Sequence, residues 1–178
     1  KLTVNHSVTI TADGTDRTIN LAEFHVTNGA TLTVDGTNGR VTINDIRKGG
    51  SIWTSAQPVV VEANSGLITR GSVTMQTKYG TGSDNGNAVN VAGEGAWAII
   101  GEGSMLAGAN KGLYLSNAKA SAHVEGGQIA SYGSATGTKS GDVGVWNAAG
   151  ELTIDDGTMN AVYSTGGTVR INGGTFKD

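Results

Sequence analysis

Apolar residues recur in one spacing pattern along this chain. The segments 152–159 and 169–176 each contain an apolar residue, a second one two positions later, a glycine three positions after it, and a last apolar residue two positions further on. The same pattern fits 98–105 and 122–129, and a weaker copy begins at Gly66. Because side chains two residues apart in a strand share a face, each copy predicts two short strands separated by a glycine corner.

Another short strand precedes each copy of the pattern. It is marked by an apolar residue seven positions before the copy and, in three cases, by another two positions earlier. These residues are Val91, Leu115, Val145 and Val162, and Val89, Leu113 and Val143. The glycines of the pattern fall at 71, 103, 127, 157 and 174, so the copies are unevenly spaced. A solenoid with corner loops of variable length accounts for this, because each of its repeats contacts only its neighbours.

Stacking these units predicts five inward apolar columns. Their members are Val89/Leu113/Val143, Val91/Leu115/Val145/Val162, Ala98/Ala122/Leu152/Val169, Ile100/Val124/Ile154/Ile171 and Met105/Ile129/Met159/Phe176. We therefore expect an all-β fold, a parallel β-helix of about seven or eight coils that spans residues 1–178 as a single domain. The alternative is a β-sandwich or jelly roll, whose strands would not repeat one register across four units.

Composition and charge narrow the choice further. Glycine accounts for 29 of the 178 residues and proline for one. This glycine content argues against helices, since each glycine in a helix costs about 1 kcal/mol relative to alanine. The sequence also lacks the regularly spaced glycine and the proline of collagen. The absence of cysteine excludes disulfides and thiolate metal sites. The net charge of −3 argues against a nucleic-acid partner, and no apolar run is long enough for membrane insertion.

A family resemblance is visible in three parts of the chain: residues 8–14, residues 25–36, and the segment 86–105 with the units after it. The chain resembles the right-handed parallel β-helix domains of large bacterial surface proteins, such as autotransporter passengers and Gram-positive cell-wall adhesins. The resemblance implies an extracellular, cell-surface module that serves as a stalk or binds glycans or proteins of host or neighbouring cells. Some relatives of that fold are polysaccharide lyases and hydrolases, and a phage tail or capsid β-helix is a further alternative.

The sequence contains no clear catalytic cluster. The outward acidic candidates are Glu102, Glu125, Asp155 and Asp156, which follow the same strand in successive units. Calcium binds to clustered carboxylate oxygens, so a stack of these side chains would be a candidate calcium site. The alternative is an acidic edge that only faces solvent. The three histidines lie far apart and have no metal-ligand spacing. We expect a non-catalytic module without a cofactor, with a carbohydrate-active enzyme as the alternative.

Two long loops, 76–87 and 130–142, should leave the same edge of the fold on either side of the short segment 106–112. They predict two ridges that flank a ligand-binding groove about 10 Å wide, which is two strand spacings. Its floor would be Asn110 and Lys111. Its sides would be Tyr79, Asp84, Asn85, Tyr132, Lys139 and Asp142. The alternative is that these loops are tolerated insertions without function.

Exposed aromatic rings are a second set of candidates. Trp97, Tyr114 and Trp146 lie beside inward residues, so strand alternation points them outward. Such rings stack on sugars or anchor protein partners, unless they fold back over the end of a coil.

Finally, Phe176 fills the last inward position without a polar cap after it. We therefore expect the chain to be a segment of a longer polypeptide.

Overall fold

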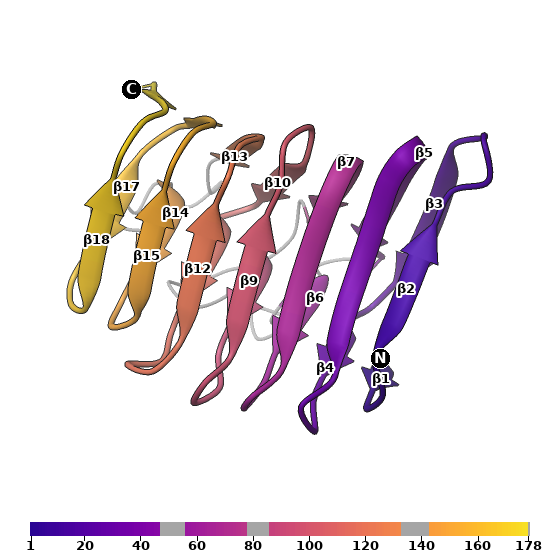
Figure 1. Cartoon of the computed structure of the whole chain (residues 1–178), viewed down its shortest axis with the longest axis horizontal. Coiled ribbons are helices and arrows are strands. Elements are labelled where there is room, and N and C mark those ends of the chain that lie inside the picture. The colour runs from indigo at the N-terminus through magenta and orange to yellow at the C-terminus, as the bar shows by residue number, and fades with distance from the viewer. Residues whose placement is uncertain (47–55, 78–85, 133–142, 178) are drawn as a thin grey trace.

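The computed structural model describes residues 1–46, 56–77, 86–132 and 143–177. Every regular element within these residues is a β-strand. They include no helix long and apolar enough to cross a membrane. The strands form two sheets, and all strand pairs in both are parallel (Figure 1). The predicted all-β fold of parallel strands is confirmed.

One sheet has seven strands, and the chain enters the second sheet after each of them. We call each of these strands, together with the strands that follow it before the next one, a pass. In spatial order the strands are β1 (Leu2–Val4), β4 (Phe24–Val26), β6 (Val59–Val61), β8 (Asn87–Val91), β11 (Lys111–Leu115), β14 (Val143–Asn147) and β17 (Val162–Ser164). The spatial order is also the chain order, so each pass adds its strand beside that of the previous pass.

The second sheet has 12 strands and is curled into two arms. The long strands β5 (Thr31–Asp45) and β7 (Gly66–Gln76) run through both arms. The first arm adds β2 (Val8–Thr11), β9 (Trp97–Ile100), β12 (Ser121–Val124), β15 (Glu151–Ile154) and β18 (Thr168–Ile171). The second arm adds β3 (Arg17–Leu21), β10 (Met105–Gly108), β13 (Gln128–Ser131), β16 (Thr158–Met159) and β19 (Thr175–Phe176).

The arms meet at a bend that requires glycine. Gly71 has a φ of +65°, and a Cβ atom at Gly36 would lie 2.2 Å from the Ser72 carbonyl oxygen of the neighbouring strand. From β9 onwards, separate short strands in the two arms replace each long strand. A pass therefore consists of three strand segments, as the spacing pattern predicts.

The core lies between the seven-stranded sheet and the two arms. Two predicted columns are confirmed by the strand register, Ala98/Ala122/Leu152/Val169 and Ile100/Val124/Ile154/Ile171. Nearly all the larger core side chains in these and the adjoining columns are fully buried in the middle passes, and exposure rises in the first and last passes.

The predicted position of Met105 in the core was wrong. Leu106, not Met105, pairs with Ile129 and is 0% exposed, whereas Met105 pairs with Gln128 and is half-buried. The corner before β10 contains one additional residue, Ser104, which is buried and donates a hydrogen bond of 2.8 Å to Thr69 Oγ1. This insertion shifts the strand by one position relative to the glycine. The weak copy at Gly66 is also displaced, because Gly66 pairs with Trp97.

In the seven-stranded sheet the predicted pairs Val89/Leu113, Val91/Leu115 and Val145/Val162 are confirmed, but both columns were wrong at the step from β11 to β14. Val143 pairs with Lys111 and Val145 with Leu113, so Asn147 lies opposite Leu115. The corner 148–150 is shorter than the corner 116–120, which moves the strand forward by two residues. Asn147 is fully buried in the inward position. Its side chain donates a hydrogen bond of 2.9 Å to the Gly150 carbonyl and accepts one of 2.8 Å from the Gly150 N–H. Both ends of the buried amide are therefore satisfied.

The corrected register predicts unequal costs for two adjacent truncations. Leu106→Ala should lower the free energy of unfolding by about 2–5 kcal/mol, because it leaves a cavity in a fully buried column. Met105→Ala should cost much less, since this side chain is half-buried on the outer face. Urea denaturation followed by circular dichroism measures both. Equal losses, or a larger loss for Met105→Ala, would contradict the register.

Candidate functional site

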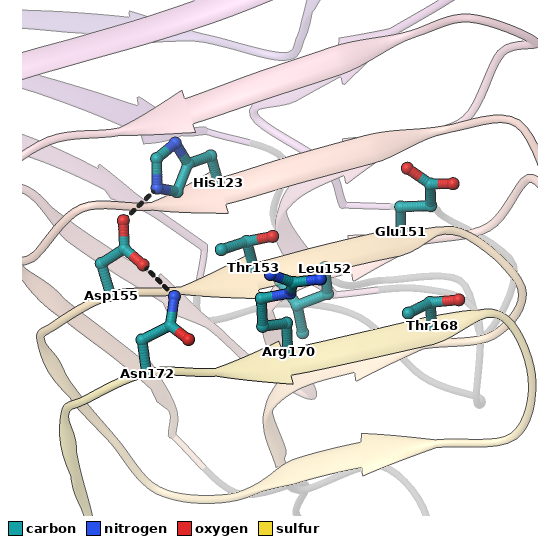
Figure 2. A pocket seen from close by; sticks show the side chains of 8 residues that line it. All are labelled: His123, Glu151, Leu152, Thr153, Asp155, Thr168, Arg170 and Asn172. Atoms are coloured by element: carbon teal, nitrogen blue, oxygen red, sulfur yellow. Dashed lines mark hydrogen bonds and ion pairs between the residues drawn. The ribbon is translucent and has the colours of Figure 1, made fainter.

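The outer face of the first arm carries a shallow depression that we call the first-arm trough. It crosses β9, β12, β15 and β18 and consists of two adjoining hollows of about 450 and 340 Å³. The hollows share His123, Glu151 and Thr153. The larger hollow, with its polar lining, is shown in Figure 2. Because a trough on the outer face of a sheet is lined by alternate residues, its lining is set by the strand register.

Two outward columns line the trough. The first is Ile99/His123/Thr153/Arg170 and the second is Trp97/Ser121/Glu151/Thr168. Each residue is flanked along its strand by the residues of the inward columns, which anchor the backbone beneath it. The trough is therefore built on packed strands rather than on loops. Such a surface holds its side chains with less freedom than a loop does.

Three side chains at the strand ends form a hydrogen-bonded chain along one margin. His123 Nε2 lies 2.6 Å from Asp155 Oδ2, and Asn172 Nδ2 donates a 2.7 Å hydrogen bond to Asp155 Oδ1 (Figure 2). The Asn172 amide, followed by His123, holds the pKa of Asp155 below its usual value. The other ring nitrogen of His123 lies 3.9 Å from Glu125 Oε1. The imidazole thus lies between two carboxylates and is hydrogen-bonded to one of them.

The other end of the trough carries an indole ring. Trp97 lies across β7, against Gly66, its partner in the register. A Cβ atom at Gly66 would lie 2.2 Å from Trp97 Cζ2, so only glycine leaves room for the ring in this position. The sheet supports the indole from one side, and its side chain remains half-buried in the hollow.

Arg170 and Glu151 are the charged groups with free hydrogen-bonding capacity. Within the part of the chain that the structure describes, neither side chain forms a hydrogen bond or an ion pair. Arg170 supplies up to five N–H donors and Glu151 two acceptor oxygens. Thr153 and Thr168 add hydroxyl groups between them. The trough therefore combines an aromatic face with donors and acceptors of both charges.

Glu102 does not join the predicted stack of carboxylates. Glu102 lies beside Gly126 rather than beside Glu125, since a Cβ atom at Gly126 would be 2.9 Å from Glu102 Cγ. Asn172 and His123 are instead the hydrogen-bonding partners of Asp155. In residues 1–46, 56–77, 86–132 and 143–177, no three His, Asp or Glu side chains gather as a metal ion requires.

The predicted aromatic residues lie on two different surfaces. Tyr114 and Trp146 pack against each other on the seven-stranded sheet in a tilted arrangement, with ring centroids 5.8 Å apart, and Tyr163 lies edge-to-face with Trp146 at 5.4 Å. Lys111 Nζ lies 4.5 Å from the Trp146 ring centroid, within cation–π range. Trp97 is on the first arm and does not join them.

The structure places three residues of the predicted loop groove. Asn110 and Lys111, the expected floor, are 2% and 0% exposed, so neither presents its side chain to a ligand. Tyr132 is 46% exposed and its hydroxyl donates 2.8 Å to Gln76 Oε1. The other groove residues lie outside the described part of the chain and stay predictions; they are Tyr79, Asp84, Asn85, Lys139 and Asp142.

Sequence reasoning identified Trp97 but did not select its polar neighbours in the trough. His123 was considered only as one of three widely separated histidines, and Arg170 was not selected as a candidate. The sequence nevertheless contained the information needed to place these residues. The register that aligns Ala122, Leu152 and Val169 also aligns the residues that follow them, His123, Thr153 and Arg170. No protein-family model, curated protein or solved structure matches this chain. Because a fold alone does not determine function, the chemistry of the trough has to support any assignment.

The Asp155 chain makes a prediction about pH. Asn172→Ala should raise the pKa of Asp155 towards its usual value, because the largest cause of the lowering is removed. The wild-type carboxylate stabilises the fold above its unfolded-state pKa, and this contribution is lost as the pH falls through the lower folded-state pKa. Carboxyl-carbon NMR titration measures the shift. Asn20→Ala, which removes an exposed amide bonded to Asn44, is the control. An unchanged Asp155 pKa in Asn172→Ala would contradict this account.

Proposed function

We propose that this chain is a right-handed parallel β-helix of about seven coils that acts as a non-catalytic carbohydrate-binding module. Seven parallel strands in chain order, each followed by strands of the two arms, support the helical architecture. We place the ligand in the first-arm trough. The observation that carries this proposal is the continuity of Trp97 with the polar columns through His123, Glu151 and Thr153.

The trough offers the two kinds of contact that a sugar needs. The indole of Trp97 presents an apolar surface to the C–H groups of a pyranose ring. Arg170, Glu151 and the His123–Asp155 pair offer donors and acceptors to its hydroxyl groups. The Asp155 carboxylate is already oriented by Asn172, so less freedom is lost when a ligand binds.

The length of the trough suits a short oligosaccharide. Neighbouring strands are about 4.8 Å apart, so β9 to β18 span about 14 Å across the strands. A linear glycan would lie across the strands and contact one residue of each column in turn. We also propose that the protein lies outside the cell on a bacterial surface, and that its partner is a glycan of a host or neighbouring cell. These two parts of the proposal rest on the sequence resemblance.

A carbohydrate-active enzyme is the second candidate. One observation favours it, the 2.6 Å hydrogen bond between His123 and Asp155, which orients an imidazole as a general base requires. In the binding proposal the same pair only contacts sugar hydroxyls. Incubation with acidic and neutral polysaccharides, followed by detection of unsaturated products and new reducing ends, separates the two candidates.

The binding proposal is tested with a glycan array and then by calorimetry on the best ligand. Trp97→Ala and Arg170→Ala should each weaken binding about tenfold or more, which corresponds to about 1.4 kcal/mol. Arg40→Ala on the second arm and Tyr163→Ala on the seven-stranded sheet are matched controls and should bind as the wild type does. Failure to bind any glycan, or full affinity in both trough variants, would reject the proposed function.

A further inference from the structure

The polar outer face of the first arm contains an apolar stretch. Its members are Trp97 and Ile99 on β9 and Ile68 on β7, and we call them the apolar patch. All three side chains point outward and are half-buried. The outward column with both isoleucines is Thr9/Thr33/Ile68/Ile99/His123/Thr153/Arg170. Because threonine, also β-branched, fits the same column at Thr33, the fold does not require isoleucine at these positions.

The apolar patch is continuous with the first-arm trough. Ile68 pairs with Ile99, and Ile99 pairs with His123 at the start of the polar part. Trp97 and Ile99 both line the smaller hollow. Residues two positions apart in a strand are separated by about 6.6 Å, so Ile99 lies beside the indole on which the proposed sugar ring stacks. A substituent of that ring therefore comes to lie over the isoleucines.

Polar groups stand at the edge of the apolar patch. Ser121 pairs with Trp97 on the next strand and is half-buried. Within the described residues its side chain forms no hydrogen bond. Its hydroxyl group both donates and accepts, and Glu151, which pairs with Ser121, adds two acceptor oxygens. Apolar surface, a donor and acceptors therefore meet within two strand spacings of the indole.

An N-acetyl group on the sugar has the matching chemistry. Its methyl group is apolar, its N–H donates a hydrogen bond and its carbonyl oxygen accepts one. With the sugar ring on Trp97, the methyl group would contact the isoleucines and the amide would face Ser121 and Glu151. A hydroxyl group at the same carbon would instead lie over apolar side chains and lose its hydrogen bonds to water, which disfavours binding.

We propose that the first-arm trough selects sugars that carry an N-acetyl group, and that Ile68 and Ile99 determine this specificity. The inference rests on the proposed carbohydrate function and names the class of sugar for the same site. A deoxy sugar also offers a methyl group to the apolar patch. It brings no amide for Ser121 and Glu151, so the arrangement favours the N-acetyl sugar.

The specificity is tested with glycans in matched pairs. One member of each pair carries an N-acetyl group, and the other carries a hydroxyl group at the same carbon of the ring. In calorimetry, the N-acetyl member should bind the wild type about tenfold more tightly, the lower end of what one apolar group contributes in a binding pocket. Equal affinity within the pairs, or tighter binding of the hydroxyl member or of a deoxy sugar, would overturn the proposal.

Ile99→Thr and Ile68→Thr test the residues themselves. Each variant should bring the affinity ratio within a pair closer to one, while the hydroxyl member binds as tightly as before. If the isoleucines only support the indole, both affinities fall together and the ratio stays the same, which contradicts the proposal. Val60→Thr makes the same kind of change on the seven-stranded sheet and should leave the ratio unaltered.

The outcomes separate this inference from the proposed function. A wild type that binds no glycan rejects both. A wild type that binds glycans through Trp97 and Arg170, but without preference for the N-acetyl group, rejects only the specificity. Circular dichroism establishes that each variant is folded, and either isoleucine variant is sufficient for the test.

Discussion

Parallel backbone pairing between successive passes is the interaction on which the rest of this structure depends. A strand of two to five residues, such as those in most passes, has no stability by itself. It is held because its neighbours supply both a hydrogen-bonded edge and an apolar side chain in the same column. This requirement tolerates changes in corner length, since a corner only has to deliver the next strand in register. Passes of unequal length can therefore share one core.

The apolar columns could be predicted in the first arm, where each strand lies at the same distance before its glycine. This held for Ala98, Ala122 and Leu152, and the structure confirms it. The prediction failed where a polar residue occupies an inward position. Ser104 and Asn147 are both buried, and each is satisfied by a hydrogen bond that a spacing pattern does not register. Periodicity in apolar residues locates strands, but it does not detect a corner that has gained or lost residues beside a buried polar group.

The trough was harder to predict for a related reason. Its residues are charged, aromatic and hydroxyl-bearing, so they have no common property along the sequence. They become a surface only when the inward columns fix which outward residues are adjacent. His123 and Asp155 are then one strand apart in space, although 32 positions separate them in sequence. The loop residues Tyr79 and Asp142 could be chosen from composition alone, but composition does not give their arrangement.

The direction of the ladder hydrogen bonds has a mechanical consequence. These bonds join neighbouring strands and so lie along the long axis, along which the strands succeed one another (Figure 1). A tension applied between the two ends of the chain loads the terminal ladders first, and one at a time. The molecule should therefore yield by peeling off single passes from its ends, each at modest force, and should lengthen stepwise. A sheet sheared along its strands would instead resist with all its bonds together and then fail at once.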